Sequence, residues 1–159
     1  MTATSSPPYE SYAALVAAFG GALVGAGILA RLLGRDPREQ SALDLAVLIA
    51  ANFKAARTVT SDEVTSWLRE PFVQGQAHSG EGEEAVEDGG MRQALGELFT
   101  CSRCIGAWTS MGLTATQMLA PRFGRLVTWS FAAAGANDFL QASFTALTAK
   151  ANELEERTS

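Results

Sequence analysis

The hydrophobic and polar positions of the chain divide it into four apolar segments separated by polar ones. The first segment, residues 11–30, contains no charged residue. A helix rises about 1.5 Å per residue, so this segment reaches roughly 30 Å, the thickness of the hydrocarbon core of a bilayer. We therefore expect an orienting transmembrane helix over residues 11–33, after a disordered N-terminus over residues 1–10.

Basic residues flank this first segment on one side only. Arg31, Arg35 and Arg38 follow it, whereas Glu10 stands before it. Because a cleaved signal peptide begins with basic residues, this arrangement favours a retained span. Positive residues favour the cytoplasmic side, so the N-terminus is expected outside the cytoplasm.

The second apolar segment lies on a predicted helix that begins at Ser41. Ser41 is a candidate N-cap, and Asp44 falls in the first turn, where the helix dipole favours an acidic side chain. The uncharged core, residues 45–53, is short for a bilayer crossing, and Lys54 and Arg57 follow on the same helix. A crossing helix and a helix on the membrane surface both fit this pattern.

A polar region separates the second and third apolar segments. Thr60 to Glu63 has the spacing of a capping box, and a short interfacial helix that carries Trp67 is expected after it, ending at Pro71. Residues 74–90 are rich in glycine and acidic residues, a composition too polar for a core, so we expect a mobile acidic loop. A calcium loop is not indicated, because its alternation of oxygen ligands is missing.

The third and fourth apolar segments, residues 105–120 and 126–147, are each predicted to be helical, and a polar tail over residues 149–159 follows them. The third reaches about 24 Å, so it crosses a bilayer only if its helix begins near the cysteines that precede it. Counting basic residues on each side favours three spans, with the second segment on the cytoplasmic surface, over four spans.

Two pairs of residues inside the predicted spans are candidate sites. Asn137 and Asp138 are polar residues at membrane depth that must face protein or water, so a functional group and a partly water-facing helix both fit. Gly21 and Gly25 have the GxxxG spacing that lets a second helix approach the backbone closely. We expect this glycine pair to form a helix-packing face.

Composition agrees with a small membrane bundle. Of the 159 residues only 18% are charged, below the roughly 25% typical of soluble domains. The net charge of −5 comes largely from the acidic loop and the tail, and it argues against nucleic acid as a partner. The predicted fold class is all-α: a small multi-pass membrane helical bundle of three or four spans, with a short interfacial helix and an acidic mobile loop.

Cys101 and Cys104 form the sharpest chemical feature. Two thiols three residues apart share one helical face or the first turn of a helix, where the dipole favours the thiolate. Structural thiols, zinc or iron binding and dithiol redox chemistry all fit. A tetrahedral metal site needs four ligands, so the motif would pair with a second copy across a homodimer, because the single histidine, His78, lies in the acidic loop. The arginines after the first span are expected to keep the motif at the cytoplasmic surface.

Three motifs support a family resemblance, and in this sequence they read Phe53-Lys-Ala-Ala-Arg57, Trp67-Leu-Arg-Glu-Pro-Phe72 and Gly96-Glu-Leu-Phe-Thr-Cys101-Ser-Arg-Cys104-Ile-Gly-Ala-Trp108. From about residue 43 to residue 147 the chain resembles the bacterial membrane family catalogued as domain of unknown function 1360. Relatives often carry proline and an aromatic residue between the cysteines, where this chain has Ser102 and Arg103. The resemblance implies a multi-pass membrane domain, here over residues 41–148, and it implies no established activity.

These features together favour a non-enzymatic role. We expect an integral accessory, scaffold or assembly protein of the bacterial cytoplasmic membrane, which contacts lipid and packs against another membrane protein or a second copy of itself. The alternative is a membrane thiol protein that uses Cys101 and Cys104 for metal binding or for dithiol redox chemistry. A third hypothesis is a small transport component centred on Asp138.

Overall fold

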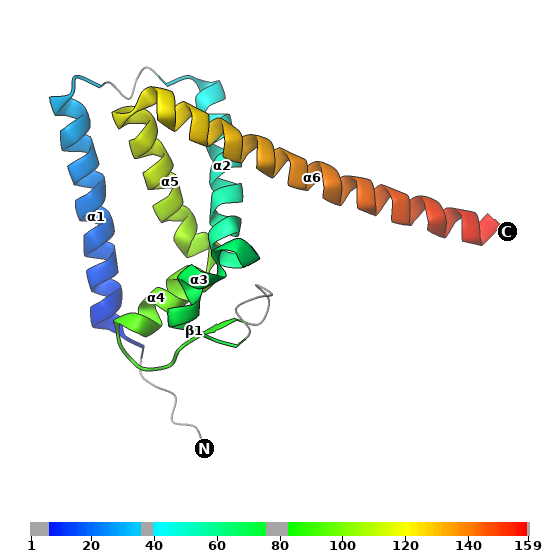
Figure 1. Cartoon of the computed structure of the whole chain (residues 1–159), viewed down its shortest axis with the longest axis horizontal. Coiled ribbons are helices and arrows are strands. Elements are labelled where there is room, and N and C mark those ends of the chain that lie inside the picture. The colour runs from blue at the N-terminus through cyan, green and yellow to red at the C-terminus, as the bar shows by residue number, and fades with distance from the viewer. Residues whose placement is uncertain (1–6, 36–39, 76–82, 159) are drawn as a thin grey trace.

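The computed structural model describes residues 7–35, 40–75 and 83–158, and helices make up most of these residues (Figure 1). The all-α fold class is therefore confirmed. Between the second and fourth helices lie two 3-10 helices and two short antiparallel strands. The elements are α1 (Tyr9–Leu32), α2 (Ala42–Ser61), η2 (Glu63–Thr65), α3 (Ser66–Arg69), η3 (Glu70–Phe72), β1 (Val73–Gln74), β2 (Glu84–Ala85), α4 (Met91–Thr100), α5 (Ser102–Leu119) and α6 (Pro121–Thr158).

Helices α1, α5 and α2 lie side by side, with α5 in the middle (Figure 1). The rings of Phe19 and Trp108 meet edge to face with their centroids 5.3 Å apart. Leu15 lines a groove with Cys104, and Gly27 lines another with Met118, so α1 and α5 run in the same direction. Gln40, just before α2, donates to Gln117 near the end of α5 at 3.4 Å. Helix α2 therefore begins where α5 ends and runs antiparallel to it.

The hydrophobic core lies where α2, α5 and α6 meet. Small side chains on α2 let α6 cross it closely, and a Cβ atom added at Gly135 would lie 3.1 Å from the carbonyl oxygen of Ala50. Apolar side chains fill the remaining space at this crossing. The buried core consists of Leu48, Ala51, Ala55 and Leu113, and Val127, Phe131 and Ala132 pack against it.

Helix α6 is much longer than the predicted segment 126–147. It begins at Pro121, a residue suited to the first position of a helix because it lacks an N–H group. It then runs across the bundle and extends beyond it (Figure 1). The residues expected to form a separate tail continue this helix, supported by the ion pair between Lys150 and Glu153 at 2.7 Å.

The predicted helix starts are correct in one case and wrong in the other. Ser41 and Asp44 form a complete capping box at the start of α2. Thr60 does not cap a following helix, because it is buried within α2 and its hydroxyl donates to the carbonyl oxygen of Ala56 at 3.0 Å. The acidic segment expected to be a mobile loop contains β2, which pairs with β1, and the mobility of residues 76–82 and of the N-terminus over 1–6 lies outside the described residues.

Within the described residues, α1 is the one helix whose length and apolar composition suit a membrane crossing. The predicted first span is thus present as a helix with only one buried residue, Ala30. The finer expectation of three or four spans is not confirmed by this measure. The second segment, for which a crossing helix and a surface helix were both open, forms α2 and packs beside α5 within the bundle. Whether it crosses a membrane stays a prediction.

Candidate functional site

The two cysteines lie at the junction between α4 and α5 and form a disulfide. Cys101 is the N-cap of α5, and its Sγ accepts a hydrogen bond from the backbone N–H of Cys104 at 3.2 Å. Cys101 is half-buried and Cys104 is exposed. A sulfur in this position accepts a backbone hydrogen bond and lies at the positive end of the helix dipole. Both effects favour a thiolate at Cys101 after reduction.

An apolar groove of about 370 Å³ opens beside Cys104, between α1, α4 and α5. Leu15, Phe19 and Trp108 supply much of its surface. Glu97 lies at its polar side, where its carboxylate accepts hydrogen bonds from the Tyr12 hydroxyl and from the Gln93 amide, the latter at 2.9 Å. The disulfide is therefore next to an apolar depression of the surface.

The geometry separates the chemical alternatives for this motif. Among the described residues, no group of three or more histidine, cysteine or acidic side chains lies close enough to hold a metal ion. His78 lies outside the described residues. Two cysteines joined to each other offer a reversible covalent bond, so dithiol redox chemistry is the reaction that this pair can perform without further ligands.

The cysteine motif lies at the opposite end of the bundle from the arginines that follow α1. Because α1 and α5 run in the same direction, Cys104 is beside the N-terminal half of α1, and Met118 is near its C-terminal end. The two groups therefore do not lie together, and the side of a membrane on which the cysteines lie stays a prediction. The sequence-based topology placed α2 on the surface of the membrane, whereas α2 runs alongside α5 from one end of the bundle to the other.

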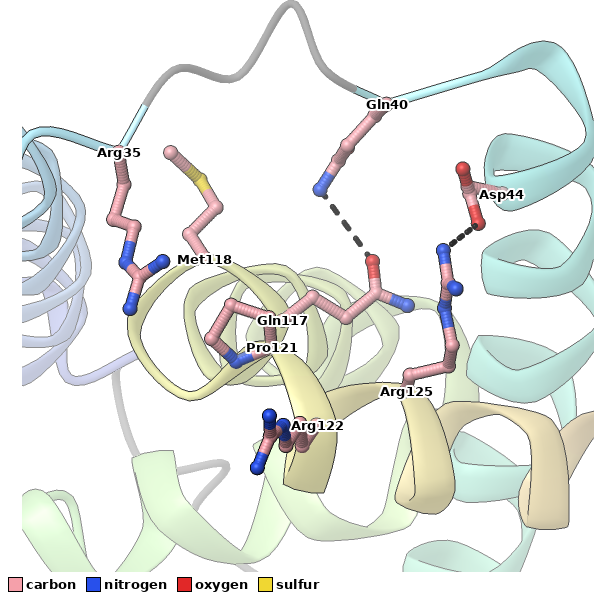
Figure 2. A pocket seen from close by; sticks show the side chains of 8 residues that line it. All are labelled: Arg35, Gln40, Asp44, Gln117, Met118, Pro121, Arg122 and Arg125. Carbon is pink, nitrogen blue, oxygen red and sulfur yellow. Dashed lines mark hydrogen bonds and ion pairs between the residues drawn. The ribbon is translucent and has the colours of Figure 1, made fainter.

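A second cluster gathers at this other end, in a pocket of about 300 Å³ (Figure 2). Arg35 comes from the turn after α1, and Arg122 and Arg125 come from the first turns of α6. Arg125 lies 3.5 Å from Asp44, whose carboxylate also accepts from the backbone N–H of Ser41 at 3.0 Å. The sequence showed these arginines only as charges to be counted, because nothing local indicates that the α5–α6 corner brings them to Arg35.

The remaining candidate residues are placed as follows. Asp138 forms an ion pair with Lys54 at 3.0 Å, joining α6 to α2, and Asn137 is exposed. A Cβ atom added at Gly21 or Gly25 would meet nothing within 4 Å in the described chain, so their role in packing stays a prediction. Their surface is open to a partner.

Sequence reasoning overlooked the most deeply buried charged pair. The Arg69 side chain has no exposed area and forms a two-pronged ion pair with Glu83, with distances of 2.8 Å from Nε and 3.1 Å from a terminal nitrogen. It also donates to the carbonyl oxygen of Val59 at 2.8 Å and to the hydroxyl of Thr65 at 2.9 Å. Arg69 stands inside one of the family motifs, and that was the available signal.

Comparison with known proteins agrees with the motifs. A family model described as "Protein of unknown function (DUF1360)" matches residues 47–144, more than half of the chain. The chain belongs to this family. The DUF1360 region contains the disulfide, the ion pair of Arg69 with Glu83 and the ion pair of Lys54 with Asp138, whereas α1 precedes it. No curated protein and no solved structure matches the chain.

Proposed function

We propose that this protein is a membrane-anchored thiol–disulfide protein, whose Cys101–Cys104 pair exchanges electrons with the thiols of another protein outside the cytoplasm. One observation carries the proposal: the disulfide lies at the start of α5, partly exposed, beside an apolar groove. A disulfide whose only role is to stabilise a fold does not need to be accessible to solvent. Exposed pairs with a stabilised thiolate are the labile ones.

The proposed membrane position follows from α1 and its neighbours. If α1 crosses the bilayer, α2 and α5 lie beside it at the same depth, and this gives a multi-pass protein with three crossing helices. Large exposed apolar side chains on α1 and α2 support contact with lipid. They include Val16, Leu23, Val24, Ile28, Leu45 and Ile49.

The proposed orientation places the disulfide on the oxidising side. Basic residues follow α1 and none precedes it, so its arginine-rich end faces the cytoplasm and its N-terminus faces outward. The disulfide at the start of α5 lies beside the N-terminal half of α1, so it is on the same outward side. Disulfides persist outside the cytoplasm of most cells. In a bacterium, the site would face outward from the cytoplasmic membrane.

The exchange reaction balances with the groups in this motif and a partner dithiol. A partner thiolate attacks the exposed Sγ of Cys104, the Cys104–Cys101 bond breaks, and Cys101 leaves as a thiolate held by the N–H of Cys104. The second partner thiolate then attacks the partner sulfur in the mixed disulfide and releases Cys104. The partner becomes a disulfide, and Cys101 and Cys104 hold the two electrons and two protons.

The redox potential of the pair tests this function. We expect the full chain in detergent to equilibrate reversibly with glutathione or dithiothreitol, with a potential above about −300 mV, because structural disulfides lie below that value. The measurement is the fraction of reduced protein after acid quenching and thiol alkylation. A pair that stays oxidised down to about −300 mV, or that is reduced only on unfolding, would show a structural bridge and contradict the proposal.

Trapping the mixed disulfide tests the assigned roles. The oxidised chain is treated with reduced glutathione, quenched with acid and alkylated, and mass spectrometry of its peptides locates the glutathione. We expect glutathione on Cys104, the exposed sulfur, and an alkylated thiol at Cys101. Cys101→Ser, which has no disulfide to attack, is the control and should not acquire glutathione from the reduced form. Glutathione found mainly on Cys101 would contradict the assignment of Cys104 as the attacked sulfur.

A second candidate function is the accessory or assembly role expected from the sequence, and a specific feature of α6 favours it. Beyond the bundle, large apolar residues repeat along α6 with spacings of four, three and seven residues, the pattern of a helix that packs on another helix. We define this set as the α6 stripe, and each member is at least half exposed: Leu140, Phe144, Leu147 and Leu154. A partner helix could lie along the α6 stripe while the disulfide performs its own reaction.

A further inference from the structure

Three arginines from two separate segments line one pocket at this end of the bundle, with Arg35 on the side of α1 and Arg125 on the side of α2 (Figure 2). Gly34 has a φ of +66°, and the N–H of Arg35 donates to the carbonyl oxygen of Ala30 at 2.9 Å. This geometry ends α1 and fixes the position of the Arg35 backbone. At the other side, a side chain at Gly124 would overlap the backbone of Gln117. Glycine is therefore required for the tight corner that brings α6 onto the end of α5.

The charge of this pocket is unbalanced. Among the described residues of the lining, Arg35, Arg122 and Arg125 contribute three positive charges and Asp44 one negative charge, a net charge of +2. Asp44 is opposite Arg125, so no other described residue of the lining offers a carboxylate to Arg35 or Arg122. The first turn of the long helix α6 adds the positive end of its dipole. An anion is the ligand that this end of the bundle suits.

An apolar groove lies next to this pocket, between α1 and α5. Its volume is about 410 Å³, and Met118 lines both cavities, so they share a wall. The groove follows α1 from Phe19 to Gly27 and is lined mostly by apolar or small side chains. A cationic pocket next to an apolar groove matches a molecule with an anionic head and a hydrocarbon tail.

We propose that this composite cavity binds an anionic phospholipid, with the phosphate at Arg35, Arg122 and Arg125 and one acyl chain in the groove between α1 and α5. Basic pockets between membrane helices on the cytoplasmic side are suited to such head groups. The inference does not depend on the thiol chemistry, because the two sites lie at opposite ends of α5. A soluble phosphate would use the pocket but not the groove.

Native mass spectrometry of the full chain in detergent, titrated with phosphatidylglycerol or phosphatidylcholine, tests the proposal. Phosphatidylglycerol should bind roughly 30-fold more tightly, since Arg35 and Arg122, which are not paired with Asp44, contribute about 1 kcal/mol each toward an anionic headgroup. The variant Arg35→Gln with Arg122→Gln should reduce its affinity to that of phosphatidylcholine. Arg157→Gln removes an exposed charge from the far end of the same helix and should leave the preference unchanged.

A second pair of variants tests the groove. Gly27→Leu places a side chain in it and should weaken binding of both lipids several-fold, while Gly20→Leu, on the same helix but outside the groove lining, should not. Equal affinity for the two lipids, or an unchanged preference after loss of both arginines, would overturn the proposal. Inorganic phosphate that binds as tightly as phosphatidylglycerol would assign the pocket to a soluble anion and overturn the lipid assignment.

Discussion

At the scale of single residues, Arg69 shows how the central family motif stabilises the fold. Its guanidinium bonds Glu83 with two nitrogens and also reaches the end of α2 through the carbonyl oxygen of Val59. Burying two charges is costly, and only this complete set of partners offsets the cost. The pair therefore ties α3, the end of α2 and the segment before β2 into one unit.

Loss of this arginine is predicted to be strongly destabilising. Arg69→Met leaves the Glu83 carboxylate buried without its partner, and we expect the free energy of unfolding to fall by about 3–5 kcal/mol. Circular dichroism during chemical denaturation in detergent measures it. Arg57→Met, at an exposed position, is the matched control and should cost less than about 1 kcal/mol.

A double variant separates the charge from the packing. Arg69→Met with Glu83→Leu removes both charges and should recover much of the stability, because two apolar side chains need no partners. If Arg69→Met costs no more than Arg57→Met, the buried pair does not have the structural role given to it here.

The sequence predicted some residue contacts and missed others for clear reasons. Ser41 and Asp44 are three residues apart, so their capping box depends on local geometry alone. Arg69 and Glu83 are fourteen residues apart, and their pairing depends on the contact of β1 with β2, which begins directly after Glu83. Local patterns do not contain such information, and a buried arginine has the same sequence appearance as an exposed one.

At the scale of elements, α6 departs most from its prediction. The apolar core of the segment marked a helix over 126–147, but polar residues beyond it continue the helix because Lys150 and Arg157 both pair with Glu153. Its first half packs on α2 at Gly135, and its second half extends away from the bundle. The first half of α6 therefore contributes to the fold, and the second half is available for contact with a partner.

The α6 stripe is predicted to mediate assembly. Leu140→Asp with Leu147→Asp should leave the helical content unchanged, since both side chains are exposed, and should abolish any complex larger than the single chain in mild detergent. Size-exclusion chromatography with light scattering measures the mass. Asn152→Asp, also exposed on α6, is the control. Complexes of unchanged mass in the double variant would rule out this surface.

At the scale of the whole molecule, the two ends of the bundle have different chemistry. One end holds the disulfide, Glu97 and the pair of Arg69 with Glu83, and the other holds Arg35, Arg122 and Arg125. The sequence identified the cysteines and the arginines separately. It did not show that they lie at opposite ends, because that depends on the direction of α2 and α5 in the bundle.

The account rests on an exchangeable disulfide that faces outward, and thiol labelling in intact cells tests this directly. Cells are treated with a membrane-impermeant reductant and then with an impermeant maleimide, and the mass added to the full chain is measured. Cys101 and Cys104 should both be labelled in intact cells after reduction and should be unlabelled without it. Labelling that requires permeabilised cells, or thiols that are already free before reduction, would contradict the account.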